Sequence, residues 1–101
     1  MPAYQLSKLA RLDLIDIADY TVGTWGPEQA QRYLDSLETC FNRLVKTPEI
    51  GRPCDRIQPG YRRIDHEKHV IFYRAANHDG IFISRVLHQR MLPSLHLIDD
   101  E

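Results

Sequence analysis

Hydrophobic residues recur at helical spacing through the first part of the chain. Within residues 8–24 the apolar stripe falls in steps of three or four, at Ala10, Leu14, Ile17, Ala18 and Thr21. Such steps place these side chains on one side of a helix. Ser7 comes immediately before the run, where its hydroxyl can accept a hydrogen bond from an amide of the first turn.

A short break separates this helix from a second one. Trp25-Gly26-Pro27 ends the first pattern, because glycine permits a left-handed backbone and proline suits the start of a new helix. The second apolar stripe lies within residues 27–46 and comprises Ala30, Tyr33, Leu34, Leu37, Phe41, Leu44 and Val45. Two such helices form a hairpin whose apolar stripes need cover. We expect Trp25 to fill the corner between the helices and that cover.

The pattern changes from helical to alternating after a loop at residues 47–60, which is rich in proline and glycine. Residues 61–65, 69–75 and 81–88 are short runs of β-branched and aromatic residues, which predict three strands. A polar turn at His66-Glu67-Lys68 joins the first two strands. Asn77-His78-Asp79-Gly80 has the composition of a hairpin turn and joins the last two.

These elements predict an α+β fold with the order β-α-α-β-β-β, in which residues 4–6 supply the first extended segment. The helical hairpin packs on one face of a small antiparallel sheet, giving two layers. A chain of 101 residues is the size of one domain, so we expect residues 1–101 to fold together. Residues 92–101 are predicted to be a tail that is flexible or ordered by a partner.

Charge is distributed unevenly, although the formal net charge is only −1. Residues 1–50 hold five Lys/Arg and seven Asp/Glu, whereas residues 51–98 hold eight Lys/Arg and four Asp/Glu. The predicted sheet is therefore the basic part, which suits an acidic partner better than a long nucleic-acid duplex. No apolar run is long enough to cross a membrane and the first residues do not resemble a signal peptide, so we expect a cytoplasmic protein.

The cysteines and histidines offer little metal chemistry. Cys40 and Cys54 are too few for a disulfide framework, and we expect both to be free thiols. His66 and His69 are spaced like a pair of ligands, but a predicted turn separates them, and no third ligand is evident beyond the nearby Cys54 and Asp65. We predict neither a metal site nor a cofactor.

The last strand ends in a His-x-Arg-Met run that is the strongest candidate for chemistry. Arg85, His88 and Arg90 could form a ribonuclease-like site, in which histidine moves a proton and arginine holds a phosphate. In a regular strand Arg85 and His88 point to opposite faces. A bulge near Gln89 could bring His88 and Arg90 together. The alternative is a solvated or partner-facing sheet edge. We favour that alternative, because no general base with a defined partner is evident.

Arginine and aromatic residues share the predicted strands. Tyr61, Phe72 and Tyr73 could stack RNA bases, but an antiparallel sheet uses the same residues to cover a helical hairpin, and we favour core packing. Arginine also forms bidentate hydrogen bonds with carboxylates at protein interfaces. The candidates for contact with a partner protein are Arg62, Arg63, Arg74, Arg85, His88, Arg90 and Met91.

The order and spacing of several motifs resemble a ParE toxin of the RelE/ParE superfamily, over nearly the whole chain. The matching N-terminal motifs are Leu6-Ser7-Lys8-Leu9-Ala10, Asp13-Leu14, Ile17, Tyr20-Thr21, Trp25-Gly26, Gln29-Ala30 and Tyr33-Leu34. The matching C-terminal motifs are Pro48-Glu49-Ile50-Gly51-Arg52, Gly60-Tyr61-Arg62, His69-Val70-Ile71-Phe72-Tyr73-Arg74 and Arg85-Val86-Leu87-His88-Gln89-Arg90-Met91.

This resemblance implies the toxin of a type II toxin–antitoxin pair, which binds DNA gyrase and blocks replication without catalysing a reaction of its own. Growth arrest and plasmid stabilisation are the associated roles. The resemblance also implies a hetero-oligomer with a ParD-like ribbon-helix-helix antitoxin, through which alone the toxin reaches operator DNA. The antitoxin's tail would fold on the toxin as a helix or an added strand. The alternative is a ribosome-dependent mRNA endoribonuclease of RelE type, using Arg85, His88 and Arg90.

Overall fold

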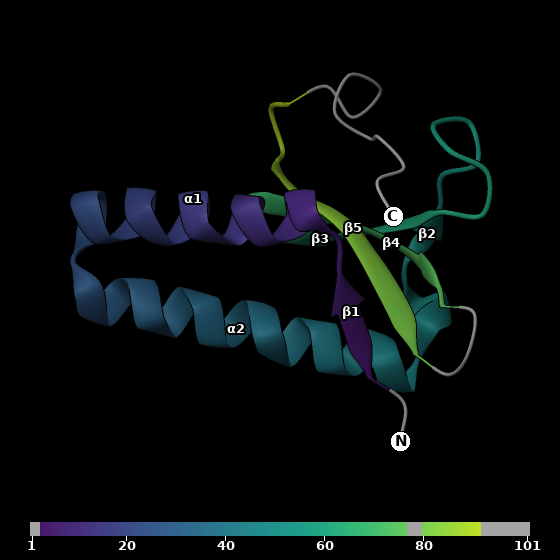
Figure 1. The fold of residues 1–101 in the computed structure, drawn as a ribbon, viewed down its shortest axis with the longest axis horizontal. Coiled ribbons are helices and arrows are strands. Elements are labelled where there is room, and N and C mark those ends of the chain that lie inside the picture. The colour runs from purple at the N-terminus through teal and green to yellow at the C-terminus, as the bar shows by residue number, and fades with distance from the viewer. Residues whose placement is uncertain (1–2, 77–79, 92–101) are drawn as a thin grey trace.

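A computed structural model describes residues 3–76 and 80–91. Figure 1 shows two long helices side by side, with the joint between them projecting beyond the sheet. The elements in chain order are β1 (Tyr4–Leu6), α1 (Lys8–Trp25), α2 (Pro27–Lys46), the 3₁₀ turn η1 (Pro48–Ile50), β2 (Arg52–Pro53), β3 (Arg62–His66), β4 (His69–Ala75) and β5 (Ile81–His88). The predicted α+β fold is confirmed, as are both helices.

The start of α1 confirms the predicted cap. The Ser7 hydroxyl oxygen accepts a hydrogen bond of 2.9 Å from the Ala10 amide, and the same hydroxyl donates one of 2.6 Å to the Ser84 carbonyl of β5. One buried serine therefore both begins the helix and ties it to the sheet. At the other end Gly26 has φ 92°, a conformation that side chains disfavour, and α2 begins directly at Pro27.

The sheet is mixed, which corrects the prediction of an antiparallel sheet. Its strand order is β1-β5-β4-β3-β2, and β1 runs parallel to β5 while the other pairs are antiparallel. The sequence showed the first extended segment but not its neighbour, because pairing between distant segments leaves no local pattern. Gly80, at φ 100°, lies so close to the Ala3 backbone that a β-carbon there would collide with it.

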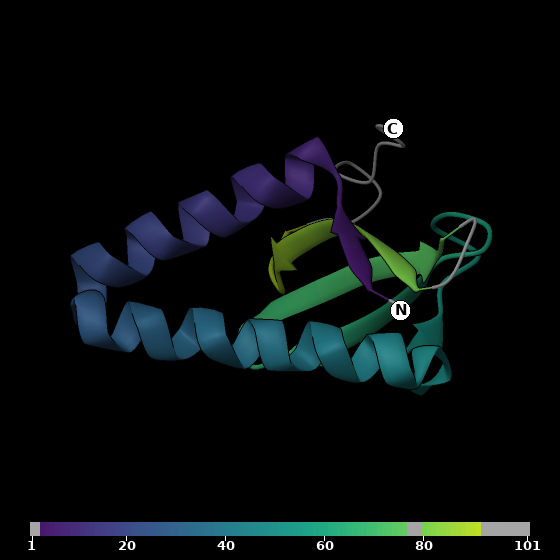
Figure 2. The same ribbon diagram turned by 60° about the horizontal axis from the view of Figure 1, so that its bottom comes forward.

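Side chains pack on both faces of the sheet. The helix-side cluster contains residues of both helices with Ile71, Tyr73, Ile81, Ile83 and Val86. Figure 2 shows α1 and α2 lying along this face. The outer cluster, on the opposite face, consists of Cys54, Tyr61, Val70, Phe72 and Leu87, with Ile57 packed against it. Core packing of Tyr61, Phe72 and Tyr73 is therefore confirmed, and the two free cysteines are buried in different clusters.

The predicted loop at residues 47–60 contains two short regular elements, η1 and β2. Strand β2 forms there because it pairs with the edge of β3. Most of the predicted hairpin turn at residues 77–79, and the predicted tail at residues 92–101, lie outside the described residues. Within the described part of the chain, no helix is both long and apolar enough to span a membrane.

Candidate functional site

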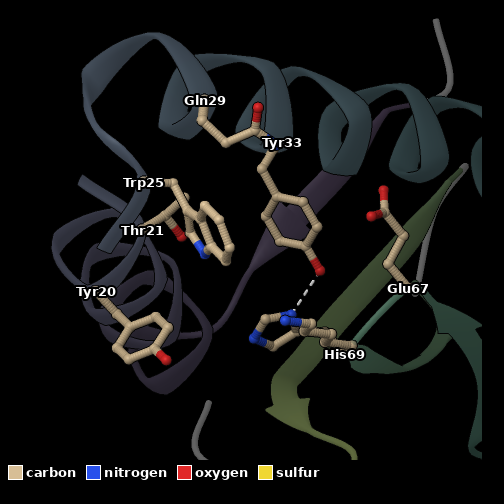
Figure 3. A pocket seen from close by; sticks show the side chains of 8 residues that line it. Tyr20, Thr21, Trp25, Gln29, Tyr33, Glu67 and His69 are labelled. Atoms are coloured by element: carbon tan, nitrogen blue, oxygen red, sulfur yellow. Dashed lines mark hydrogen bonds between the residues drawn. The ribbon is translucent and has the colours of Figure 1, made fainter. Parts of the chain in front are cut away.

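An open pocket lies between the helical hairpin and the turn that joins β3 to β4. Its volume is about 340 Å³. Figure 3 shows aromatic side chains from both helices around it, with His69 on the sheet side. We call it the aromatic pocket; its lining residues are Tyr20, Thr21, Trp25, Gln29, Tyr33, Glu67, Lys68 and His69. Apolar walls with a few polar groups are typical of ligand or partner sites.

His69 is the centre of a group of polar rings beside this pocket. Its Nδ1 lies 2.6 Å from the Tyr33 hydroxyl, within one hydrogen bond (Figure 3). The His88 ring lies edge-on to it, with 5.6 Å between the ring centres. His66 is held separately, because its Nε2 shares a hydrogen bond of 2.9 Å with the Ser36 hydroxyl. Strands β3, β4 and β5 thus each contribute one histidine.

Burial decides the ionisation of this group. Burial lowers the pKa of His69 from 6.5 to about 4, with smaller contributions from the neighbouring His88 and His66. It also raises the pKa of Tyr33 to about 12, with help from the negative charge of Glu67. His69 and Tyr33 are therefore both neutral at physiological pH. A neutral His69 cannot attract a phosphate by charge, although it can accept or donate a hydrogen bond.

Arg85 is bound to the helix layer. Its Nε and Nη2 donate hydrogen bonds of 2.8 Å to the two carboxylate oxygens of Asp13 on α1. Asp13 also accepts a bond of 3.0 Å from the Val86 amide. Only 10% of the Arg85 side chain and 12% of the Asp13 side chain are exposed. The guanidinium is thus engaged in a nearly buried, bidentate ion pair.

Two further candidate arginines lie over aromatic rings. The Arg63 guanidinium lies 5.6 Å from the centre of the Phe72 ring, and that of Arg74 lies 4.4 Å from the centre of the Phe82 ring. Such cation–π contacts order both side chains on the outer face of the sheet. Arg62 lies apart from them, because its Nη1 donates a bond of 2.7 Å to the Gly51 carbonyl.

The end of β5 brings the remaining candidates together. His88 is half-buried, whereas Arg90 and Met91 are exposed. The Arg90 amide donates a bond of 3.2 Å to His88 Nδ1, so backbone and ring meet without a strand bulge. The bulge considered near Gln89 is not what brings them together: Gln89 begins a turn, and the register shift of β4 and β5 lies between Phe72 and Tyr73. A turn changes chain direction more sharply than a bulge does.

No group of three or more histidine, cysteine, aspartate or glutamate side chains within residues 3–76 and 80–91 is arranged to hold a metal ion. Hydrogen bonds to Tyr33 and Ser36 already occupy one ring nitrogen each of His69 and His66.

A comparison with protein families accounts for this combination of fold and residues. The family described as "ParE toxin of type II toxin-antitoxin system, parDE" matches residues 4–93. This chain belongs to the ParE toxin family. The match spans all the described strands and helices, so the membership of the superfamily expected from the sequence is confirmed.

Individual ParE proteins agree with this result. Toxin ParE1 of Mycobacterium tuberculosis is 44% identical over 88 residues, which are 87% of this chain and 90% of the relative. Toxin ParE1 of Caulobacter vibrioides is 39% identical over 97 residues, covering 96% and 99% of the two chains. A solved chain of the "Chromosomal ParDE TA system from P. aeruginosa" has a TM-score of 0.73 and 26% identity, covering 87% of this chain and 96% of its own.

Sequence reasoning missed three features of this ParE site. The ion pair of Asp13 with Arg85 left no signal in the sequence, because the two residues are 72 positions apart. Tyr33 was expected in the apolar stripe, yet its hydroxyl binds His69. Trp25 was predicted to fill a corner, which is wrong: it is 64% exposed, because the joint of the hairpin extends past the strands that would have covered it. The sequence signal that could have indicated the aromatic pocket was a tyrosine and a tryptophan near the joint between the two helices.

Proposed function

We propose that this ParE family member arrests growth by binding DNA gyrase, and that a ParD-like antitoxin neutralises it in a hetero-oligomer. Its family membership across residues 4–93 carries the proposal. The pairing with an antitoxin is supported by the similar fold of the P. aeruginosa chain, which comes from a ParDE system. Operator DNA is reached only through the antitoxin, and gyrase places the action of the toxin in the cytoplasm.

The geometry favours binding over catalysis. The suggested ribonuclease site needs the Arg85 guanidinium to bind a phosphate. Two nitrogens of that guanidinium, Nε and Nη2, already donate hydrogen bonds to the Asp13 carboxylate. Removing Arg85 from that carboxylate to hold a phosphate would leave a nearly buried negative charge unpaired, which is unfavourable by several kcal/mol.

The contact surface that we propose includes the exposed end of β5. Arg90 and Met91 are both exposed there, and half-buried His88 lies beside them. A cation next to a methionine suits interfaces, where arginine and methionine are enriched. Arg63 and Arg74 extend the basic surface over the outer face of the sheet. These residues, with Arg62 and Arg85, remain candidates for contact with gyrase or the antitoxin.

A supercoiling assay tests the main activity. Purified toxin should inhibit gyrase or trap cleaved DNA, and antitoxin added beforehand should abolish the effect. Arg90→Glu should weaken inhibition at least about tenfold if the end of β5 contacts gyrase, because charge reversal at an interface is unfavourable. Arg32→Glu, an equal charge change on an exposed site of α2, is the matched control. Gyrase that stays fully active at micromolar toxin would refute the proposal.

A ribosome-dependent endoribonuclease is the second candidate, and one observation favours it. His69, His88 and Tyr33 cluster beside the aromatic pocket, and such groups can transfer protons. Primer extension on mRNA after induction distinguishes the two activities. New 5′ ends that vanish in His88→Ala would support cleavage, whereas intact mRNA together with inhibited gyrase would exclude it.

A further inference from the structure

The aromatic pocket has the composition of a cage for a positively charged ligand. Tyr20 and Trp25 of α1 line one side of it, and Tyr33 of α2 lines another (Figure 3). Tyr20 is 70% exposed and Trp25 is 64% exposed, so the fold itself buries neither ring. The faces of tyrosine and tryptophan rings carry partial negative charge, and several such rings around one cavity attract a cation.

The ring of Tyr33 is held in place without a ligand. Its hydroxyl lies 2.6 Å from His69 Nδ1. Its ring centre lies 5.5 Å from that of His69 and 5.8 Å from that of His66. Trp25 is positioned by the end of α1, because the chain turns at Gly26 directly after it. A ligand therefore need not order the Tyr33 ring, and a site that is ordered in advance binds more tightly.

The charges beside the rings also favour a cation. Glu67 lines the pocket from the turn between β3 and β4, and its carboxylate lies 3.7 Å from His66 Nε2, beyond hydrogen-bond distance. Within the described part of the chain, Lys68 is the one cationic side chain that lines the pocket, and its exposed, flexible chain can turn toward solvent. Burial lowers the pKa of His69 to about 4, so this histidine adds no positive charge at physiological pH.

We propose that the aromatic pocket binds a small, free organic cation with a quaternary ammonium group, of which choline is a simple example. The methyl groups of such a cation contact ring faces and need no hydrogen bonds, whereas a lysine-like ammonium has three donors to satisfy. An anion would be repelled by Glu67 and by the ring faces. The volume of about 340 Å³ lies at the lower end of small-molecule sites. The inference does not depend on gyrase inhibition.

The fluorescence of Trp25, the single tryptophan of the chain, reports directly on the pocket. Choline chloride is added to the whole chain, freed of any antitoxin, while sodium chloride keeps the ionic strength constant. The emission should change along a saturable curve with half-saturation at about 1 mM. The neutral analogue of choline, in which carbon replaces the nitrogen, has the same shape and should bind at least about fivefold more weakly.

Two positions separate the contributions of ring and charge. Tyr20→Leu removes an exposed ring and should raise the dissociation constant of choline about threefold or more, whereas Tyr20→Phe keeps the ring and should stay within about twofold. Glu67→Gln should raise it about twofold to fivefold, because solvent screens an exposed carboxylate. Glu49→Gln in η1, beyond the opposite end of α2, is the matched control and should leave binding unchanged. Circular dichroism confirms that each variant is folded.

Four results would overturn this inference. The first is Trp25 emission that choline leaves unchanged up to about 20 mM. The second is equal affinity for choline and its neutral analogue, which would show that apolar contact alone is responsible. The third is a choline response that Tyr20→Leu and Glu67→Gln both leave unchanged, which would place the binding elsewhere. The fourth is a response to phosphatidylcholine vesicles without one to free choline, which would place the ligand on a membrane surface.

Discussion

Asp13 and Arg85 join the first helix to the last strand through two hydrogen bonds of 2.8 Å. The same carboxylate receives the Val86 amide, which lies in β5 beyond the residues that pair with β1. One side chain therefore neutralises a nearly buried arginine and satisfies a backbone donor at the point where β5 loses its neighbouring strand. The contact holds α1 against the sheet, and α1 in turn supplies part of the aromatic pocket.

Replacement of Asp13 should destabilise the fold strongly. Asp13→Ala leaves the Arg85 cation nearly buried and unpaired, and it removes the acceptor of the Val86 amide. We expect the free energy of unfolding to fall by about 3 kcal/mol. Urea unfolding followed by circular dichroism measures the change. Asp16→Ala, at an exposed position of the same helix, should stay within about 0.5 kcal/mol. Equal losses in the two variants would contradict this account.

Loss of the Tyr73 hydroxyl should destabilise the fold, although the ring of the tyrosine would be retained. It donates a bond of 2.5 Å to the Pro48 carbonyl and accepts one of 3.0 Å from the Gly51 amide, which fixes the chain as it enters β2. Tyr73→Phe leaves both backbone groups without that partner, so we expect a loss of about 1 to 3 kcal/mol in unfolding free energy. Tyr20→Phe, at a residue 70% exposed, is the control and should cause little change.

Stability should fall on acidification because of His69. Its pKa is lowered to about 4 in the folded protein, against 6.5 for the free side chain, chiefly by burial and then by His88 and His66. The unfolded chain therefore binds more protons between these values. Stability is fully present above pH 6.5 and is lost as the pH falls toward 4.

Linkage measurements check this sign. The contribution of His69 to the free energy of unfolding should amount to roughly 1 to 2 kcal/mol, since partial exposure of its ring reduces the electrostatic effect. His69→Gln, which cannot take up a proton, should show a flatter decline of unfolding free energy over the same pH range. A decline of equal slope in the variant would show that other groups control the acid response.

Both thiols should react slowly in the folded protein. Burial raises the pKa of Cys40 and of Cys54, against the opposing positive charges of Arg43 and Arg63 respectively. Little reactive thiolate is present at neutral pH, and access is restricted. A colorimetric thiol reagent should therefore modify the native chain at least about tenfold more slowly than the chain in denaturant. Rapid labelling of one thiol under native conditions would identify a locally open cluster.

The local sequence was sufficient for both helices, the Ser7 cap, the joint at Gly26 and the three long strands. These features depend on residues close together in the chain, where spacing and turn chemistry act directly. Alternation along β5 likewise predicted opposite faces for neighbouring residues, and Val86 and Leu87 do pack in different clusters. The order of motifs also sufficed to identify the family.

Only the tertiary structure decided which distant groups meet. Asp13 and Arg85 are 72 positions apart, and nothing local in either segment specifies that they pair. Parallel pairing of β1 with β5, the position of His69 between Tyr33 and His88, and the exposure of Trp25 depend on how the hairpin lies against the sheet. Periodicity shows which face of an element is buried, but the packing of all the elements together determines what that face contacts.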